Sequence, residues 1–85
     1  MITVFTIKNC PYCEKLKKSL NENNIEFTEI SDTNPKNEKH FVQLVALTKS
    51  EMMPTIIVGN DIFVPNVSFK TIDEGIGLIK SRLTD

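Results

Sequence analysis

The spacing of apolar and polar positions changes several times along the chain, and each change predicts a new element. Residues 2–7 form a β-branched and aromatic run, which predicts a buried first strand. From Pro11 onward, apolar residues recur at helical spacing opposite a charged face, which predicts an amphipathic helix ending within residues 21–24. Residues 25–30 then alternate between apolar and polar, as in a strand with one face more buried. Strand, helix and strand in succession predict a right-handed parallel βαβ unit.

The second half of the chain predicts a helix, a hairpin and a final helix. Residues 31–38 are polar, and the apolar positions that follow share one helical face. Residues 54–58 and 62–64 flank Gly59-Asn60-Asp61, a turn sequence that tight hairpins prefer. Residues 71–83 repeat isoleucine and leucine at helical intervals. The order βαβαββα predicts an α/β fold in which helices cover both faces of a small mixed sheet.

Length and charge narrow the class of protein. A chain of 85 residues suffices for one core, so we expect a single domain over residues 1–85. Ten basic residues against eleven acidic ones give a net charge of -1, so neither nucleic acid nor an anionic membrane is an expected partner. The apolar N-terminal run is too short for a membrane span and lacks a preceding basic segment. We therefore expect a cytoplasmic protein.

The two cysteines are separated by two residues, and this spacing favours reactivity over a structural role. A bridge between Cys10 and Cys13 closes so short a loop that it stabilises the chain little. In a reducing cytosol, a bridge that forms and breaks is the better interpretation. We expect Cys10, at the turn from strand to helix, to be the nucleophile and Cys13, on the apolar helix face, to be the resolving thiol. Pro11 and Tyr12 would hold the turn between them.

A thiolate at Cys10 needs stabilisation, because an ordinary cysteine has a pKa of about 8.5. Lowering that pKa by two units takes about 2.7 kcal/mol, whereas a helix dipole contributes at most about 2 kcal/mol. We therefore expect direct hydrogen bonds to Cys10 from the N–H groups of Tyr12 and Cys13 at the helix N-terminus. Lys8 is a possible secondary source of positive charge.

A zinc site is the main chemical alternative for the cysteine pair. Structural zinc requires four ligands, and the other soft ligand in the chain is His40, alone on a predicted helix. No metal is therefore expected. Met52 and Met53 either fill gaps in the core or, directly before Pro54, form a functional turn.

The run Cys10-Pro11-Tyr12-Cys13 after a first strand, with Met53-Pro54 opening a later strand, resembles the dithiol glutaredoxins over essentially the whole chain. The resemblance implies a thioredoxin-like fold with a cis peptide between Met53 and Pro54. It also implies that the Met53 backbone binds the cysteinyl part of glutathione and that Tyr12 lies beside the bound tripeptide.

Two segments depart from the family pattern. The basic residue that usually lies three positions before the first cysteine is replaced by Ile7, and Lys8 follows one position later. The usual Gly-Gly turn after the hairpin is replaced by residues 64–68, in which Asn66 tolerates a positive φ and Ser68 is expected to cap the last helix. Together with Tyr12, Met53 and Pro54, we expect Lys8, Asn66 and Ser68 to contact glutathione.

The resemblance implies three possible functions. The first is a monomeric thiol-disulfide oxidoreductase that reduces protein or glutathione mixed disulfides and is regenerated by glutathione. The second is a related redoxin that takes electrons from thioredoxin reductase and delivers them to ribonucleotide reductase. The third is a carrier in which two chains and two glutathiones hold an iron-sulfur cluster through Cys10, against which Pro11 argues. Outside the resemblance, the fold could also be an interaction module with inert cysteines.

Overall fold

The computed structural model describes residues 1–83 and has the predicted α/β architecture. The order βαβαββα is confirmed, with a short 3-10 helix, η1, inserted before the second α-helix. In chain order the elements are β1 (Ile2–Thr6), α1 (Pro11–Glu22), β2 (Thr28–Ser31), η1 (Pro35–Asn37), α2 (Glu38–Thr48), β3 (Thr55–Val58), β4 (Asp61–Phe63) and α3 (Ile72–Leu83). Within the described part of the chain, no helix is long and apolar enough to cross a membrane.

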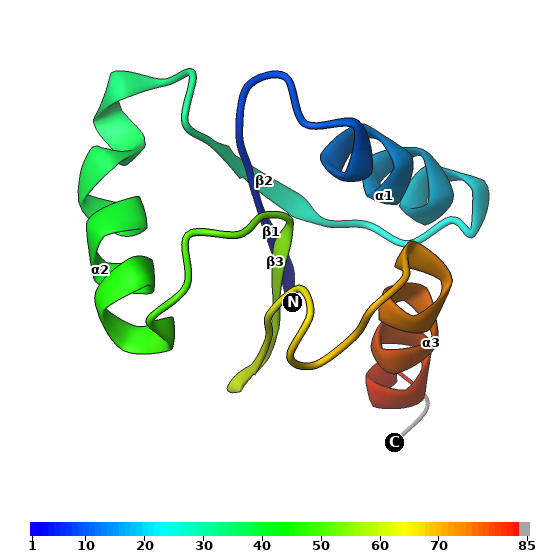
Figure 1. Ribbon diagram of the computed structural model, residues 1–85. Coiled ribbons are helices and arrows are strands. Elements are labelled where there is room, and N and C mark those ends of the chain that lie inside the picture. The colour runs from blue at the N-terminus through cyan, green and yellow to red at the C-terminus, as the bar shows by residue number, and fades with distance from the viewer. Residues whose placement is uncertain (84–85) are drawn as a thin grey trace.

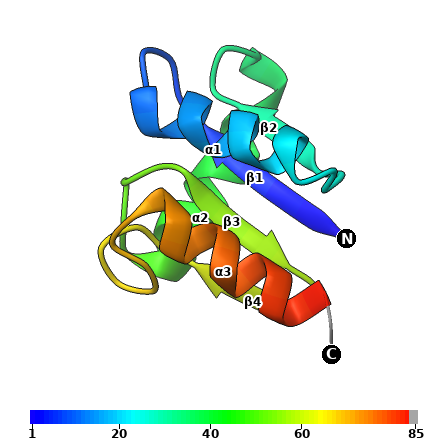
Figure 2. The ribbon, with the colours of Figure 1, turned by 90° about the vertical axis from the view of Figure 1, so that its right-hand side faces the viewer.

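The four strands form one mixed sheet in the order β2-β1-β3-β4. Strand β1 runs parallel to β2 and antiparallel to β3, while β3 and β4 form the predicted hairpin. Helices α1 and α3 cover one face of the sheet and α2 covers the other (Figures 1 and 2). Because β1 is a central strand, the loop at its C-terminal end is held by pairing on both sides before α1 begins.

Each face of the sheet has its own hydrophobic cluster. The larger cluster joins α1 and α3 to the sheet through Leu16, Leu20, Ile72, Ile76 and Ile79, which pack with Ile2, Val4, Ile56 and Val58. The smaller cluster lies on the α2 side and consists of Phe5, Cys13, Leu44 and Met53, with Cys10, Ile30, Phe41 and Ile57 at its edge. Both cysteines therefore belong to the smaller cluster, so the packing of α2 supports the dithiol.

The second strand starts later than predicted. It begins at Thr28, whereas the alternating pattern suggested a start at Ile25. The Ile25 N–H donates to the Leu20 carbonyl oxygen at 2.9 Å, which keeps residues 23–25 against the end of α1. Asn24 has a φ of 56°, which turns the chain out of the helix. Ile25 is thus buried by the helix end and not by strand pairing.

Candidate active site

Cys10 lies at the end of the loop that joins β1 to α1, and Cys13 lies in the first turn of α1. Asn9 adopts a φ of 58° in the connecting loop, and Cys10 is extended with φ -111° as the N-cap of the helix. Pro11 occupies the first helical position, where its missing N–H leaves no hydrogen bond unmade. The two cysteines form a disulfide across one helical turn.

The two sulfur atoms differ in access. Cys13 is 1 % exposed and packs with Phe5, Leu44 and Met53. Cys10 is half-buried at the edge of the same cluster. An incoming thiol or disulfide therefore reaches Cys10 and is screened from Cys13.

The helix N-terminus supplies a hydrogen-bond donor to Cys10. The Cys13 N–H donates to Cys10 Sγ at 3.1 Å, and the Glu14 N–H donates to the Cys10 carbonyl oxygen at 3.2 Å. The Tyr12 N–H was expected to be a second donor, but within residues 1–83 it forms no hydrogen bond with Cys10 Sγ. In the reduced protein, the Cys13 N–H and the positive end of α1 would favour negative charge on Cys10 Sγ.

The turn before β3 lies against the dithiol. The peptide between Met53 and Pro54 is cis, and the Met53 carbonyl oxygen is 3.8 Å from Cys10 Sγ. Thr55, which is 1 % exposed, donates its hydroxyl to the Met52 carbonyl oxygen at 3.1 Å. The sequence pattern did not single out Thr55, because a threonine at a strand start is common; its hydroxyl nonetheless fixes the turn that faces Cys10.

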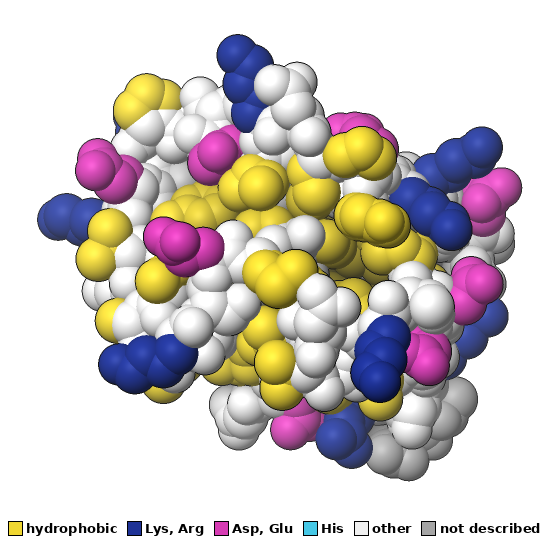
Figure 3. All heavy atoms as spheres, viewed as in Figure 1, with side chains coloured by type: hydrophobic (Ala, Val, Ile, Leu, Met, Phe, Trp, Pro, Cys, Tyr) yellow, Lys and Arg dark blue, Asp and Glu magenta, His cyan; other side chains and the backbone are white. Residues whose placement is uncertain are grey.

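A groove of about 170 Å³ begins beside this turn. Four of the residues expected to contact glutathione line it, namely Tyr12, Met53, Pro54 and Asn66. Its other walls come from the loop before α3 and the start of α3, including Phe69, Lys70, Thr71 and Ile72. Hydrophobic side chains gather in a hollow at the centre of the molecular face in Figure 3, and lysines and acidic residues lie mostly around it.

Asn66 has the positive φ that the turn sequence suggested, at 65°. Its side-chain amide donates to Met52 Sδ at 3.4 Å, so the two residues touch across the groove rim. Lys70 and Thr71 were missed as groove residues because nothing in the sequence places the loop before the last helix beside the cysteines. The signals available were their position directly before an amphipathic helix and the capping-box sequence from Thr71 to Glu74, which marks a helix start.

Lys8 and Ser68 do not line the groove. The Lys8 N–H donates to Asp32 Oδ1 at 2.9 Å, and Lys8 borders a different hollow with Glu14 and Lys17. Ser68 Oγ accepts the Val64 N–H at 3.0 Å and closes the loop after β4. The expectation that Ser68 caps the last helix is wrong, because α3 begins at Ile72 and the cap is formed by the preceding residue.

The cap of α3 is a reciprocal pair between Thr71 and Glu74. Thr71 Oγ1 accepts the Glu74 N–H at 3.1 Å, and Glu74 Oε1 accepts the Thr71 and Lys70 N–H groups at 3.3 and 2.7 Å. This is a capping box, which satisfies the free donors of a helix start. It fixes the end of the groove away from the cysteines.

A charged network joins α1 to the sheet. Lys17 Nζ lies 2.9 Å from Glu29 Oε2 and 3.1 Å from Glu14 Oε1, and the Thr6 hydroxyl donates to Glu29 Oε2 at 2.7 Å. The Thr6 hydrogen bond, followed by that of Lys17, lowers the pKa of Glu29. The hydrogen bond that Lys17 donates to Glu29 is the main cause that raises the pKa of Lys17.

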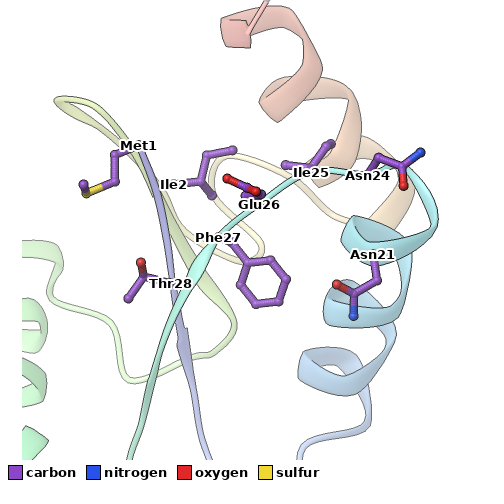
Figure 4. Close-up of a pocket in the computed structure, with 8 residues that line it drawn as sticks. All are labelled: Met1, Ile2, Asn21, Asn24, Ile25, Glu26, Phe27 and Thr28. Carbon is purple, nitrogen blue, oxygen red and sulfur yellow. The ribbon is translucent and has the colours of Figure 1, made fainter.

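A larger hollow of the surface lies elsewhere. It has a volume of about 970 Å³ and is lined by Met1, Ile2, Asn21, Asn24, Ile25, Glu26, Phe27 and Thr28 (Figure 4). These residues surround the N-terminal ends of β1 and β2, whereas the dithiol follows the C-terminal end of β1. The hollow contains neither cysteine nor histidine, so it is not the candidate site. Among residues 1–83, no group of three or more His, Cys, Asp or Glu side chains could hold a metal ion.

Comparisons with known proteins agree with this geometry. An uncharacterised glutaredoxin-like 8.6 kDa protein of the rubredoxin operon of Clostridium pasteurianum is 28 % identical over 64 residues, which are 75 % of this chain and 83 % of that protein.

Solved structures show the same fold at low sequence identity. Buckwheat glutaredoxin in complex with glutathione has a TM-score of 0.70 at 17 % identity, with 94 % of this chain and 68 % of that chain covered. The thioredoxin-like protein BC3987 has a TM-score of 0.70 at 24 % identity, with 92 % and 99 % covered. The Glutaredoxin family profile matches residues 2–63. The chain, with its Cys-x-x-Cys pair and thioredoxin-like fold, belongs to the glutaredoxin family.

Proposed function

We propose that this protein is a thiol-disulfide oxidoreductase that reduces protein or glutathione mixed disulfides through Cys10 and Cys13 and is regenerated by glutathione. The observation that carries the proposal is the asymmetry of the dithiol. The Cys10 sulfur is partly accessible and accepts a backbone N–H, and its partner Cys13 is 1 % exposed. Such a pair can react with one external sulfur at a time.

The burial of Cys13 dictates the order of bond changes. In the reduced protein, the Cys10 thiolate attacks the mixed disulfide, a Cys10–substrate sulfur bond forms, and the other sulfur leaves as a thiolate that takes up a proton to become a thiol. Cys13 then loses its proton and attacks Cys10, which releases the second substrate sulfur as a thiol. The protein dithiol is thereby oxidised to a disulfide, and its two electrons reduce the substrate disulfide to two thiols, which take up the proton lost by Cys13 and one proton from solvent.

Glutathione restores the dithiol by the reverse order of attack. A glutathione thiolate attacks Cys10, Cys13 leaves and is protonated, and a second glutathione attacks the mixed disulfide to give oxidised glutathione. The groove that begins at Tyr12 and Met53 offers apolar walls and a backbone edge for a short peptide bound to Cys10. The buckwheat relative of the same fold is a complex with glutathione, which supports this choice of ligand.

A coupled assay with glutathione, glutathione reductase and a glutathione mixed disulfide tests the proposal. We expect the wild type to turn over and Cys10→Ser to be inactive. Cys13→Ser should keep activity on glutathione mixed disulfides, which need only Cys10, and lose activity on protein disulfides. Turnover by the wild type no faster than by Cys10→Ser would contradict the proposal.

Regeneration by thioredoxin reductase is the second candidate, with ribonucleotide reductase as a possible acceptor. It is favoured by the position of Lys8 outside the groove and by Val64-Pro65 in place of a Gly-Gly turn. The same assay, with thioredoxin reductase and NADPH replacing glutathione and glutathione reductase, separates the two electron sources. Reduction of the protein disulfide by the enzyme alone, at a rate above that with glutathione, would favour this candidate.

A further inference from the structure

Lys70 is the one residue with a charged side chain among those that line the groove beside Cys10. It lies in the loop that leads into α3 and is exposed, and its ammonium forms no ion pair with residues 1–83. The other walls are apolar or neutral. Among the side chains that line the groove, the only charge is therefore the positive charge of Lys70.

The backbone donors at this end of the groove are already used. Glu74 Oε1 accepts both the Lys70 N–H and the Thr71 N–H, so neither is free for a ligand anion. The Asn66 amide, which also lines the groove, donates to Met52 Sδ. An anionic group at the α3 end of the groove has the Lys70 side chain as its cationic partner.

We propose that Lys70 binds a carboxylate of the glutathionyl group that is disulfide-linked to Cys10, and so makes the protein prefer anionic over neutral disulfides. This assignment rests on the proposed function and names a specificity-determining residue within it. Glutathione carries two carboxylates and one ammonium group. No residue that lines the groove has a carboxylate that could bind the ammonium group of glutathione. Recognition by charge thus depends on the ligand's acidic groups.

Single-turnover oxidation tests the role of Lys70 without any electron donor. The reduced protein is mixed with oxidised glutathione or with the same disulfide after esterification of all its carboxylates. One disulfide forms between Cys10 and Cys13, and two glutathione thiols are released with the two protons. Acid quenching and mass spectrometry give a second-order rate constant for each disulfide.

The ratio of the two rate constants, acid over ester, is the readout. The ester reports any change in the reactivity of Cys10 itself, so the ratio isolates recognition of the carboxylates. We expect Lys70→Met to lower the ratio about threefold and Lys70→Glu to lower it about tenfold, as for the loss and reversal of an exposed charge pair. Lys39→Glu, on α2 across the sheet, makes the same change in net charge and should leave the ratio nearly unchanged.

Equal ratios in the wild type, Lys70→Glu and Lys39→Glu would overturn the assignment and leave the proposed function intact. An equal fall in both charge-reversal variants would also overturn it, because net charge would then be the cause. Failure of both disulfides to oxidise the wild-type dithiol would instead overturn the proposed function, and the assignment with it.

Discussion

At the scale of single residues, the site depends on two cysteines that are alike in chemistry and unlike in surroundings. Cys10 caps α1 and accepts the Cys13 N–H at 3.1 Å, while Cys13 points into the cluster of Phe5 and Leu44. The same helical turn therefore gives one sulfur a hydrogen-bond donor and partial access, and gives the other neither. Nucleophile and resolving thiol are roles that follow from this difference.

Alkylation of single-cysteine variants should reveal the difference directly. In Cys13→Ser, Cys10 should react with iodoacetamide at about pH 6 at least about tenfold faster than Cys13 does in Cys10→Ser, because a stabilised and accessible thiolate reacts fastest. Mass spectrometry of quenched samples gives both rates, with unfolded protein in denaturant as the reference. Similar rates in the two folded variants would contradict the assignment of roles.

Thr55 is the residue whose hydroxyl holds the turn opposite Cys10. Removing it in Thr55→Val leaves the Met52 carbonyl without its 3.1 Å donor, so we expect the free energy of unfolding to fall by about 1 kcal/mol. The KM for a glutathione mixed disulfide should rise as the turn loosens. Thr55→Ser keeps the hydroxyl and is the control; if denaturant unfolding and KM are the same for both variants, the hydrogen bond has no such role.

At the scale of elements, the strands and helices could be predicted where the apolar period was long and uninterrupted. Helix α1 began at Pro11 as its pattern indicated, and the turn at Gly59 identified the hairpin. The start of β2 could not be predicted, because Ile25 packs in the larger hydrophobic cluster while its N–H bonds back to Leu20 at the end of α1, and an apolar residue held there looks the same in the sequence as one in a strand. Lys70 was missed for a related reason. It lies near Tyr12 and Met53 only in the folded protein, because the loop before α3 packs beside the turn at Pro54.

Helix α3 contains two glycines whose surroundings differ, and they form a matched pair. A Cβ on Gly77 would meet nothing within 4 Å, whereas a Cβ on Gly75 would lie 3.3 Å from the Phe69 ring that lines the groove. Gly77→Ala should raise the free energy of unfolding by about 0.5 to 1 kcal/mol, because alanine favours the helix.

Gly75→Ala should gain the same stability from the helix preference of alanine, but its new Cβ also pushes against the Phe69 ring. We expect its stability to lie below that of Gly77→Ala, and the KM for a glutathione mixed disulfide to change only in Gly75→Ala. Denaturant unfolding and steady-state kinetics of the two variants, measured side by side, check both statements. An identical gain in stability with unchanged KM in both would show that Phe69 moves aside freely.

At the scale of the whole molecule, the topology brings three separate segments to one end of the sheet. The strand order places β1 between β2 and β3, so the dithiol after β1 faces the turn before β3, and the loop after β4 returns beside it. On the other side of α1, Lys17 and Thr6 both bond to Glu29 on β2. This network ties the helix that carries the cysteines to two strands, and its strength depends on pH.

The pH dependence of stability follows from the direction of the two pKa shifts. The folded protein lowers the pKa of Glu29 from its ordinary value of 4.5, so the stability it contributes is present above that value and is lost as the pH falls through the lower folded value. The pKa of Lys17 is raised from 10.5, so its contribution is present below that value and is lost as the pH rises through the higher folded value. The ion pair of Lys17 and Glu29 therefore makes its full contribution to the free energy of unfolding between about pH 5 and pH 10.

Replacing Glu29 by glutamine should remove this dependence at the acid end. Because the Glu29 side chain is 35 % exposed, solvent screening limits the loss to about 1 kcal/mol near pH 7. At an acid pH below the lowered pKa of Glu29, where the wild-type carboxyl is protonated, the two proteins should differ less. Glu26→Gln is the control, since Glu26 forms neither a hydrogen bond nor an ion pair with residues 1–83, and its difference from the wild type should stay constant. Denaturant unfolding at the two pH values measures all three proteins, and a Glu29→Gln deficit that is equal at both would mean that the ionised carboxylate adds nothing to the attachment of α1.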